Sequence, residues 1–74
     1  MSLSDAIVRI LSEDMGPAGV HFYNRICQTM NKHPASITGE ELDVFAKYVY
    51  AAARRSLDEQ TAWSLYNKIL RLKK

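Results

Sequence analysis

The chain is poor in cysteine, with Cys27 alone among its 74 residues, so no disulfide can form within it. A small secreted scaffold held together by disulfide bridges is therefore excluded. No uninterrupted apolar run approaches the roughly 18 residues that cross a bilayer, and the first residues lack the basic and then apolar pattern of a secretory signal. We expect a cytoplasmic protein that does not associate with membranes.

Glycine and proline are also scarce, with three and two copies. The segment Met15-Gly16-Pro17 matches neither a Walker loop nor a dinucleotide-binding loop, so a phosphate-cradling glycine loop is not expected. No Asn-Gly or Asp-Gly pair marks a hairpin turn, and no stretch alternates long enough with a two-residue period to predict a strand. Helical periodicity remains, and it predicts an all-α fold.

The composition is that of a globular protein, with 47% apolar and 24% charged residues. A chain of this length has surface enough for one small domain. We predict a single helical domain over residues 1–74, folded as a compact four-helix bundle with short connections. The expected helices cover about residues 4–15, 17–31, 38–54 and 56–72.

The first two helices are expected to meet at a sharp corner. Ser4 is a suitable N-cap for the first helix. Gly16 can end that helix and Pro17 can begin the next one, which leaves almost no connecting length. The sequence therefore predicts an oblique crossing of these two helices at Gly16-Pro17.

The last two helices carry repeated start signals. Thr38 and Glu41 have the spacing of a capping box, which predicts the start of the third helix. Ser56 and Glu59 repeat that spacing. Ser56 is therefore the predicted N-cap of the fourth helix.

Each expected helix has one apolar stripe that we assign to the core. The stripe of the fourth helix covers about half of its circumference, which predicts a central position for that helix. The predicted core residues are Leu3, Ile7, Ile10 and Leu11; Val20, Phe22, Tyr23, Ile26, Cys27 and Met30; Leu42, Phe45, Val49, Ala52 and Ala53; and Ala62, Trp63, Leu65, Tyr66, Ile69, Leu70 and Leu72.

The titratable residues do not suggest a catalytic or metal site. Three carboxylates cluster in the first turn of the third helix, where negative charge complements the helix dipole: Glu40, Glu41 and Asp43. His21 lies on a polar face, Cys27 on an apolar face and His33 in a loop, so they do not converge as zinc ligands would. No Gly-x-Ser-x-Gly nucleophile motif occurs. We predict no enzyme activity, no metal, no cofactor and no small-molecule substrate.

Charge is divided unevenly along the chain. Residues 1–45 hold three Lys/Arg and six Asp/Glu, whereas residues 46–74 hold seven and two. A basic face on the fourth helix, with an arginine pair before it, allows an alternative function as a weak nucleic-acid-binding protein. The residues proposed for that function are Arg54, Arg55, Lys68, Arg71 and Lys74.

A second, weaker apolar strip lies opposite the core stripe of the third helix. It consists of Val44, Tyr48, Ala51 and Arg55, which follow one another at helical spacing; we call these four residues the contact strip. Tyrosine and arginine beside small apolar residues are typical of protein interfaces. The leading prediction is a non-enzymatic interaction or regulatory module that binds another protein chain or forms a homodimer through this strip.

Overall fold

The computed structural model describes residues 2–72, and their regular structure is entirely helical. The helices are joined by two tight turns and one longer connection, residues 30–41, which contains two 3₁₀ turns. The α-helices are α1 (Leu3–Met15), α2 (Ala18–Thr29), α3 (Leu42–Ser56) and α4 (Glu59–Arg71), and the 3₁₀ turns are Pro34–Ser36 and Gly39–Glu41. No strand occurs between residues 2 and 72, so the predicted all-α bundle is confirmed.

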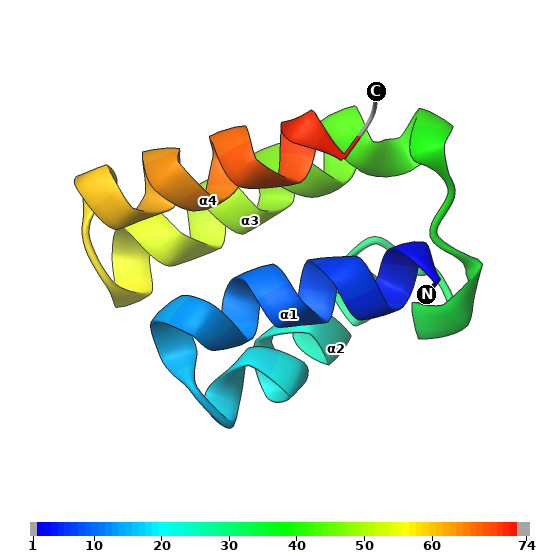
Figure 1. Ribbon diagram of the computed structural model, residues 1–74, viewed down its shortest axis with the longest axis horizontal. Coiled ribbons are helices and arrows are strands. Elements are labelled where there is room, and N and C mark those ends of the chain that lie inside the picture. Colours follow the sequence, from blue (N-terminus) through cyan, green and yellow to red (C-terminus); the bar gives the residue numbers. More distant parts are fainter. Residues whose placement is uncertain (1, 73–74) are drawn as a thin grey trace.

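The four helices form two hairpins that stack on each other (Figure 1). In that view α1 and α2 make the lower hairpin, and α3 and α4 make the upper one. Packing is dense within each hairpin and sparser between them, where α1 faces α4 and α2 faces α3. Two seams therefore separate the hairpins, one on each side of the core.

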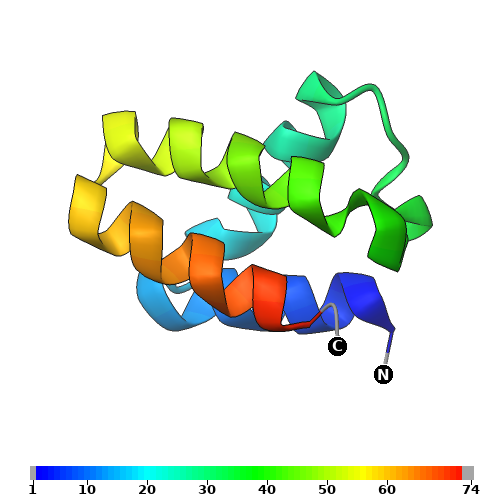
Figure 2. The same ribbon diagram turned by 90° about the horizontal axis from the view of Figure 1, so that it is seen from above.

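The corner between α1 and α2 forms where the sequence predicts it. Gly16 has a φ of 63°, in the region that favours glycine, and its N–H donates to the carbonyl of Ser12 at 2.8 Å. Figure 2 shows α2 running obliquely to α1. The helices approach each other at Gly19, which is buried and leaves no room for a side chain against Ser12.

One apolar core fills the space between the hairpins. All four helices contribute to it, which matches the predicted stripes. The largest fully buried side chains are those of Phe45, Ile7, Leu11, Leu42, Leu65, Ile69, Val49 and Cys27.

Tyr23 fixes the long connection against this core. Its side chain is 3% exposed, and its hydroxyl donates to the carbonyl of Pro34. The hydroxyl of Ser4 donates to the same carbonyl at 2.8 Å. Burial raises the pKa of Tyr23 to about 12. The phenol therefore stays neutral and, together with Ser4, holds the long connection at Pro34.

Several helix ends differ from the predicted ones. The N-cap of α1 is Ser2, whose hydroxyl accepts from the N–H of Asp5 at 3.1 Å, because Ser4 lies inside the helix and bonds to the long connection. At the other end of the first hairpin, α2 stops at Thr29, and Asn31 turns into the left-handed region with a φ of 59°.

The predicted start of α4 at Ser56 is wrong. Ser56 is the last residue of α3, because the N–H of Leu57 still donates to the carbonyl of Ala53 at 2.8 Å. Asp58 is extended instead, and its carboxylate accepts from the N–H of Thr61 at 2.6 Å. The true cap therefore lies two residues later.

The start of α3 agrees with the prediction more closely. The capping box forms, with the Glu41 carboxylate accepting from the N–H of Thr38 at 3.0 Å. The first turn is a 3₁₀ turn, Gly39–Glu41, and the α-helix proper begins at Leu42.

Two large residues that we assign to the core lie half in solvent. Val20 is 45% exposed and Trp63 is 47% exposed. Gly19 lies against α1, which turns Val20 away from the core, and the Trp63 ring lies against Tyr50 and Tyr66. Neither position follows from the helical wheel, because the wheel does not show the direction from which a neighbour approaches.

Candidate contact surface on α2 and α3

The contact strip lies on the outer face of α3, where the sequence places it. Val44 is 48% exposed and Tyr48 is 38% exposed, and both Ala51 and Arg55 are exposed. Large apolar side chains of this size are more often buried in a folded domain. The face therefore offers a row of apolar contacts that the core does not use.

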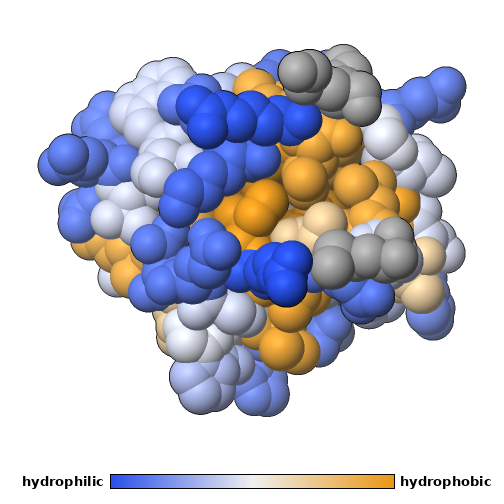
Figure 3. Space-filling view, in the orientation of Figure 1, coloured by the Kyte–Doolittle hydropathy of each residue, from blue (hydrophilic) through white to orange (hydrophobic). Residues whose placement is uncertain are grey.

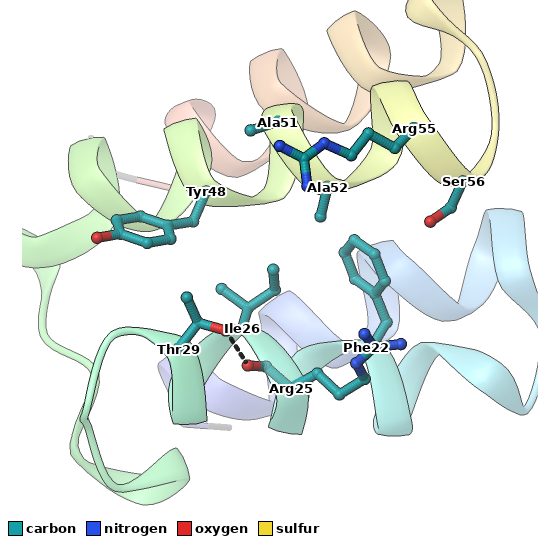
Figure 4. A pocket seen from close by; sticks show the side chains of 9 residues that line it. All are labelled: Phe22, Arg25, Ile26, Thr29, Tyr48, Ala51, Ala52, Arg55 and Ser56. Atoms are coloured by element: carbon teal, nitrogen blue, oxygen red, sulfur yellow. Dashed lines mark hydrogen bonds between the residues drawn. The ribbon is translucent and has the colours of Figure 1, made fainter.

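A groove runs beside the strip, between α3 and α2 (Figure 4). Its volume is about 270 Å³. The residues that line this α2–α3 groove are Phe22, Arg25, Ile26 and Thr29 from α2, and Tyr48, Ala51, Ala52, Arg55 and Ser56 from α3. Three of the four residues of the contact strip thus form one wall of it, and Val44 lies beyond its end.

The groove has an apolar floor and a basic rim. Figure 4 shows the Phe22 ring and the Ile26 side chain pointing from α2 toward α3, with Ala52 above them. The Arg55 side chain runs along α3, and its guanidinium lies near Ala51 and Ala52. Arg25 supplies the second cation, from the opposite wall.

The polar group on the α2 wall is already satisfied. The hydroxyl of Thr29 donates to the carbonyl of Arg25 at 3.0 Å, as the dashed line in Figure 4 marks. The groove therefore presents its apolar floor, the two guanidinium groups, and the hydroxyls of Tyr48 and Ser56 on the α3 wall.

A second hollow of about 460 Å³ continues the groove toward the α1–α2 corner. It shares Phe22, Arg25 and Ser56 with the α2–α3 groove. Its other lining residues are Asp14, Met15, Ala18, His21 and Leu57. Together the two hollows make one extended depression along the seam between the hairpins.

The charges around the α2–α3 groove are unpaired within the described part of the chain. Neither Arg25 nor Arg55 forms an ion pair with a residue between positions 2 and 72. The same is true of Glu40, which is exposed just before α3. The contact strip therefore has two positive charges at its C-terminal end, Arg55 within it and Arg25 on α2, and one negative charge, Glu40, before its N-terminal end.

The residues of the proposed basic face do not gather in one place. Arg54 and Arg55 lie near the end of α3, whereas Lys68 and Arg71 lie near the end of α4, and the two helices run in opposite directions (Figure 1). Lys74 lies outside the described residues. The predicted nucleic-acid surface is therefore divided between opposite ends of one hairpin.

Two of these cations also have partners within the chain. The Nζ atom of Lys68 lies 3.8 Å from Oδ2 of Asp14 and 3.9 Å from Oε1 of Glu13. The guanidinium carbon of Arg54 lies 5.5 Å from the ring centre of Tyr50. Both contacts reduce the positive charge that is available to a phosphate backbone.

An aromatic cluster lies at the edge of the α3–α4 contact, away from the groove, and helical periodicity does not predict it. The ring centres of Tyr50 and Trp63 are 4.9 Å apart, and those of Trp63 and Tyr66 are 5.4 Å apart. The apolar stripe of the fourth helix assigns Trp63 and Tyr66 to the core, and it does not indicate that their rings stack at the edge of the core. We assign this cluster to hairpin stability, since its rings contact one another.

A second apolar surface lies on the opposite seam. Figure 3 shows an apolar band between α4 above and α1 below. Both helices have partly buried apolar side chains packed against the core, among them Ile10 on α1 and Leu70 on α4. The α2–α3 groove, unlike this band, adjoins the contact strip, so the candidate surface is assigned to the groove side.

The titratable groups have structural explanations. The pKa of Glu41 is lowered by its ion pair with Lys32, at 2.6 Å, and by the N–H of Thr38. Burial raises the pKa of the Cys27 thiol, which disfavours the nucleophilic thiolate. Among residues 2–72 no three His, Cys, Asp or Glu side chains are grouped so that they could hold a metal ion.

The α2 wall of the groove is the part of the site that the sequence analysis misses. Phe22 and Ile26 belong to the predicted core stripe of the second helix, and Arg25 to its polar face. Ile26 is indeed buried, but the side chains of Phe22 and Ile26 also line an open groove. The position of Phe22 at the edge of the stripe is the one sequence signal that points this way.

Comparison of the chain with protein-family models, curated proteins and solved structures finds no match to any of them. None of the helices within residues 2–72 is both long and apolar enough to cross a membrane.

Proposed function

We propose that this protein is a non-enzymatic interaction module of the cytoplasm, which binds a helical segment of a protein chain. The observation that carries the proposal is the joining of the exposed contact strip to the α2–α3 groove. Together they form an apolar surface that extends across two helices. Grooves between helices bind amphipathic helices by this means.

The residue types of this surface support the proposal. Tyrosine and arginine are enriched among the residues that contribute most to binding energy, and Tyr48 and Arg55 both lie on the α3 wall of the groove. Phe22 provides an aromatic anchor from the opposite wall. Arg25 and Arg55 at the rim favour a partner whose helix has acidic side chains beside its apolar face.

Cross-linking in the source cell tests this function whatever the identity of the partner. A benzophenone amino acid at position 51, in place of Ala51, should give a cross-linked product after irradiation. The same amino acid at Gln60, an exposed position on α4, is the control. Tyr48→Asp should remove the product at position 51. Equal yields from positions 51 and 60 would contradict the proposal.

A further inference from the structure

We propose that the segment which binds this surface is α3 of a second copy of the chain, antiparallel to the first and related to it by a twofold axis near Tyr48. This inference rests on the proposed function and names its partner. The chain would thus form a symmetric homodimer. In such a dimer the same surface of both copies must be complementary to itself.

The charges on α3 and on the 3₁₀ turn before it are arranged for this symmetry. Glu40 lies eight residues before Tyr48, and Arg55 lies seven residues after it. At a rise of about 1.5 Å per residue in the α-helix and about 2 Å in the 3₁₀ turn that contains Glu40, both are on the order of 10 to 13 Å from the axis. The antiparallel arrangement therefore brings Glu40 of each copy level with Arg55 of the other, whereas a parallel one would place Arg55 beside Arg55.

The apolar residues are arranged in the same way. Val44 lies four residues before Tyr48 and outside the groove, whereas Ala52 lies four residues after Tyr48 and within it. The twofold axis places Val44 of each copy level with Ala52 of the other. An exposed apolar side chain and an open apolar wall are thereby brought together twice, once on each side of the axis.

Tyr48 would lie at the centre of the interface, beside its own symmetry mate. A central aromatic residue with charged pairs at the rim is the usual distribution of an interface. A standard interface covers about 800 Å² per partner, roughly one sixth of the 4817 Å² surface of this chain. The outer face of α3 and the adjoining groove can supply such an area because they extend across two helices.

Single charge reversals test the inference by sedimentation over a concentration series. The unaltered chain should dimerise. Either Glu40→Arg or Arg55→Glu should weaken the dimer about tenfold, because each places two pairs of like charges across the symmetric interface. Arg9→Glu, which reverses an exposed charge on α1, is the matched control and should leave dimerisation unchanged. Circular dichroism verifies that each variant keeps its helices.

Mixing the two variants is the decisive measurement. A heterodimer of Glu40→Arg with Arg55→Glu has an arginine opposite a glutamate at both pairs, so mixing the two variants should recover dimerisation. The Glu40→Arg/Arg55→Glu double variant has opposite charges at both pairs and should recover dimerisation by itself. Recovery both in the mixture and in the double variant is the result that the antiparallel arrangement predicts, and a mixture or a double variant that stays monomeric would overturn it.

Each contrary result has a separate meaning. A dimer weakened by Tyr48→Asp but unaffected by the charge reversals would overturn the antiparallel arrangement and keep the proposed function. A chain that stays monomeric while position 51 cross-links to a different protein would overturn the second copy as partner. Absence of both dimer and cross-link would overturn the proposed function itself.

Discussion

In the α1–α2 hairpin the helices approach each other through a glycine, whereas in the α3–α4 hairpin aromatic rings and alanines fill the contact. A Cβ atom at Gly19 would lie 2.8 Å from the backbone nitrogen of Ser12 and 2.9 Å from its Cα. The other hairpin has Tyr50, Trp63 and Tyr66 stacked at its edge. One contact therefore depends on an absent side chain and the other on large ones.

The difference shows that a short chain can pack two helix pairs tightly by different kinds of contact. Close backbone approach makes the first hairpin intolerant of added volume, since backbone atoms cannot rotate away. The second hairpin derives part of its stability from ring contacts at a half-exposed edge, which can adjust to substitution. The effects of substitutions on the free energy of unfolding should therefore differ between the two hairpins, both in magnitude and in additivity.

The largest expected effect is that of Gly19→Ala. Overpacking against the backbone lowers stability by about 1 to 3 kcal/mol, and the better helix propensity of alanine offsets at most about 1 kcal/mol of this loss. We expect the free energy of unfolding to fall by about 2 kcal/mol in urea denaturation. Gly39→Ala is the control, because a Cβ there meets nothing within 4 Å; it should be neutral or stabilise. A stable Gly19→Ala variant would contradict the close approach.

The ring contact in the α3–α4 hairpin should appear as a coupling energy. A double-mutant cycle of Tyr50→Leu and Trp63→Leu, measured by urea denaturation, should give a coupling energy of about 1 kcal/mol. Ring pairs contribute about 0.5 to 1.5 kcal/mol beyond the burial of their area. Tyr48→Leu with Trp63→Leu is the matched cycle and should be additive, because Tyr48 lies on the opposite, groove side of α3. Equal coupling in both cycles would mean that the Tyr50–Trp63 contact contributes nothing specific.

The smallest expected effect concerns the turn between α3 and α4. Asp58→Ala should lower the Tm because it removes the N-cap of α4, whereas Ser56→Ala should change it little. The N–H of Thr61 holds the pKa of Asp58 below its ordinary value of 3.8. A lowered pKa in the folded state gives stability that is present above the ordinary value and lost as the pH falls through the folded one.

The pH dependence of the difference in Tm between the unaltered chain and Asp58→Ala tests this prediction. Thermal unfolding of the unaltered chain and of Asp58→Ala should differ at neutral pH and converge as the pH is lowered below about 3.8. If Ser56→Ala lowered the Tm more than Asp58→Ala did, Ser56 and not Asp58 would be the N-cap of α4.

The contact surface divides into a part that the sequence predicts and a part that it does not. Val44, Tyr48 and Ala51 are apolar at positions opposite the core stripe of their own helix, and helical periodicity alone places them outward. Phe22 and Ile26 lie on the core side of theirs, and only the distance between α2 and α3 leaves them facing an open groove. Periodicity within one helix contains no information about that distance.

Local spacing, together with the φ that a residue tolerates, is enough to predict four helices, the stripes that bury Ile7, Phe45 and Leu65, and the turn at Gly16. Three features appear only in the folded chain: Ser56 continues α3, Trp63 stacks at an edge, and a groove opens between the hairpins. Trp63 and the groove depend on how neighbouring helices approach each other, and the end of α3 depends on a backbone hydrogen bond that capping-box spacing alone does not reveal.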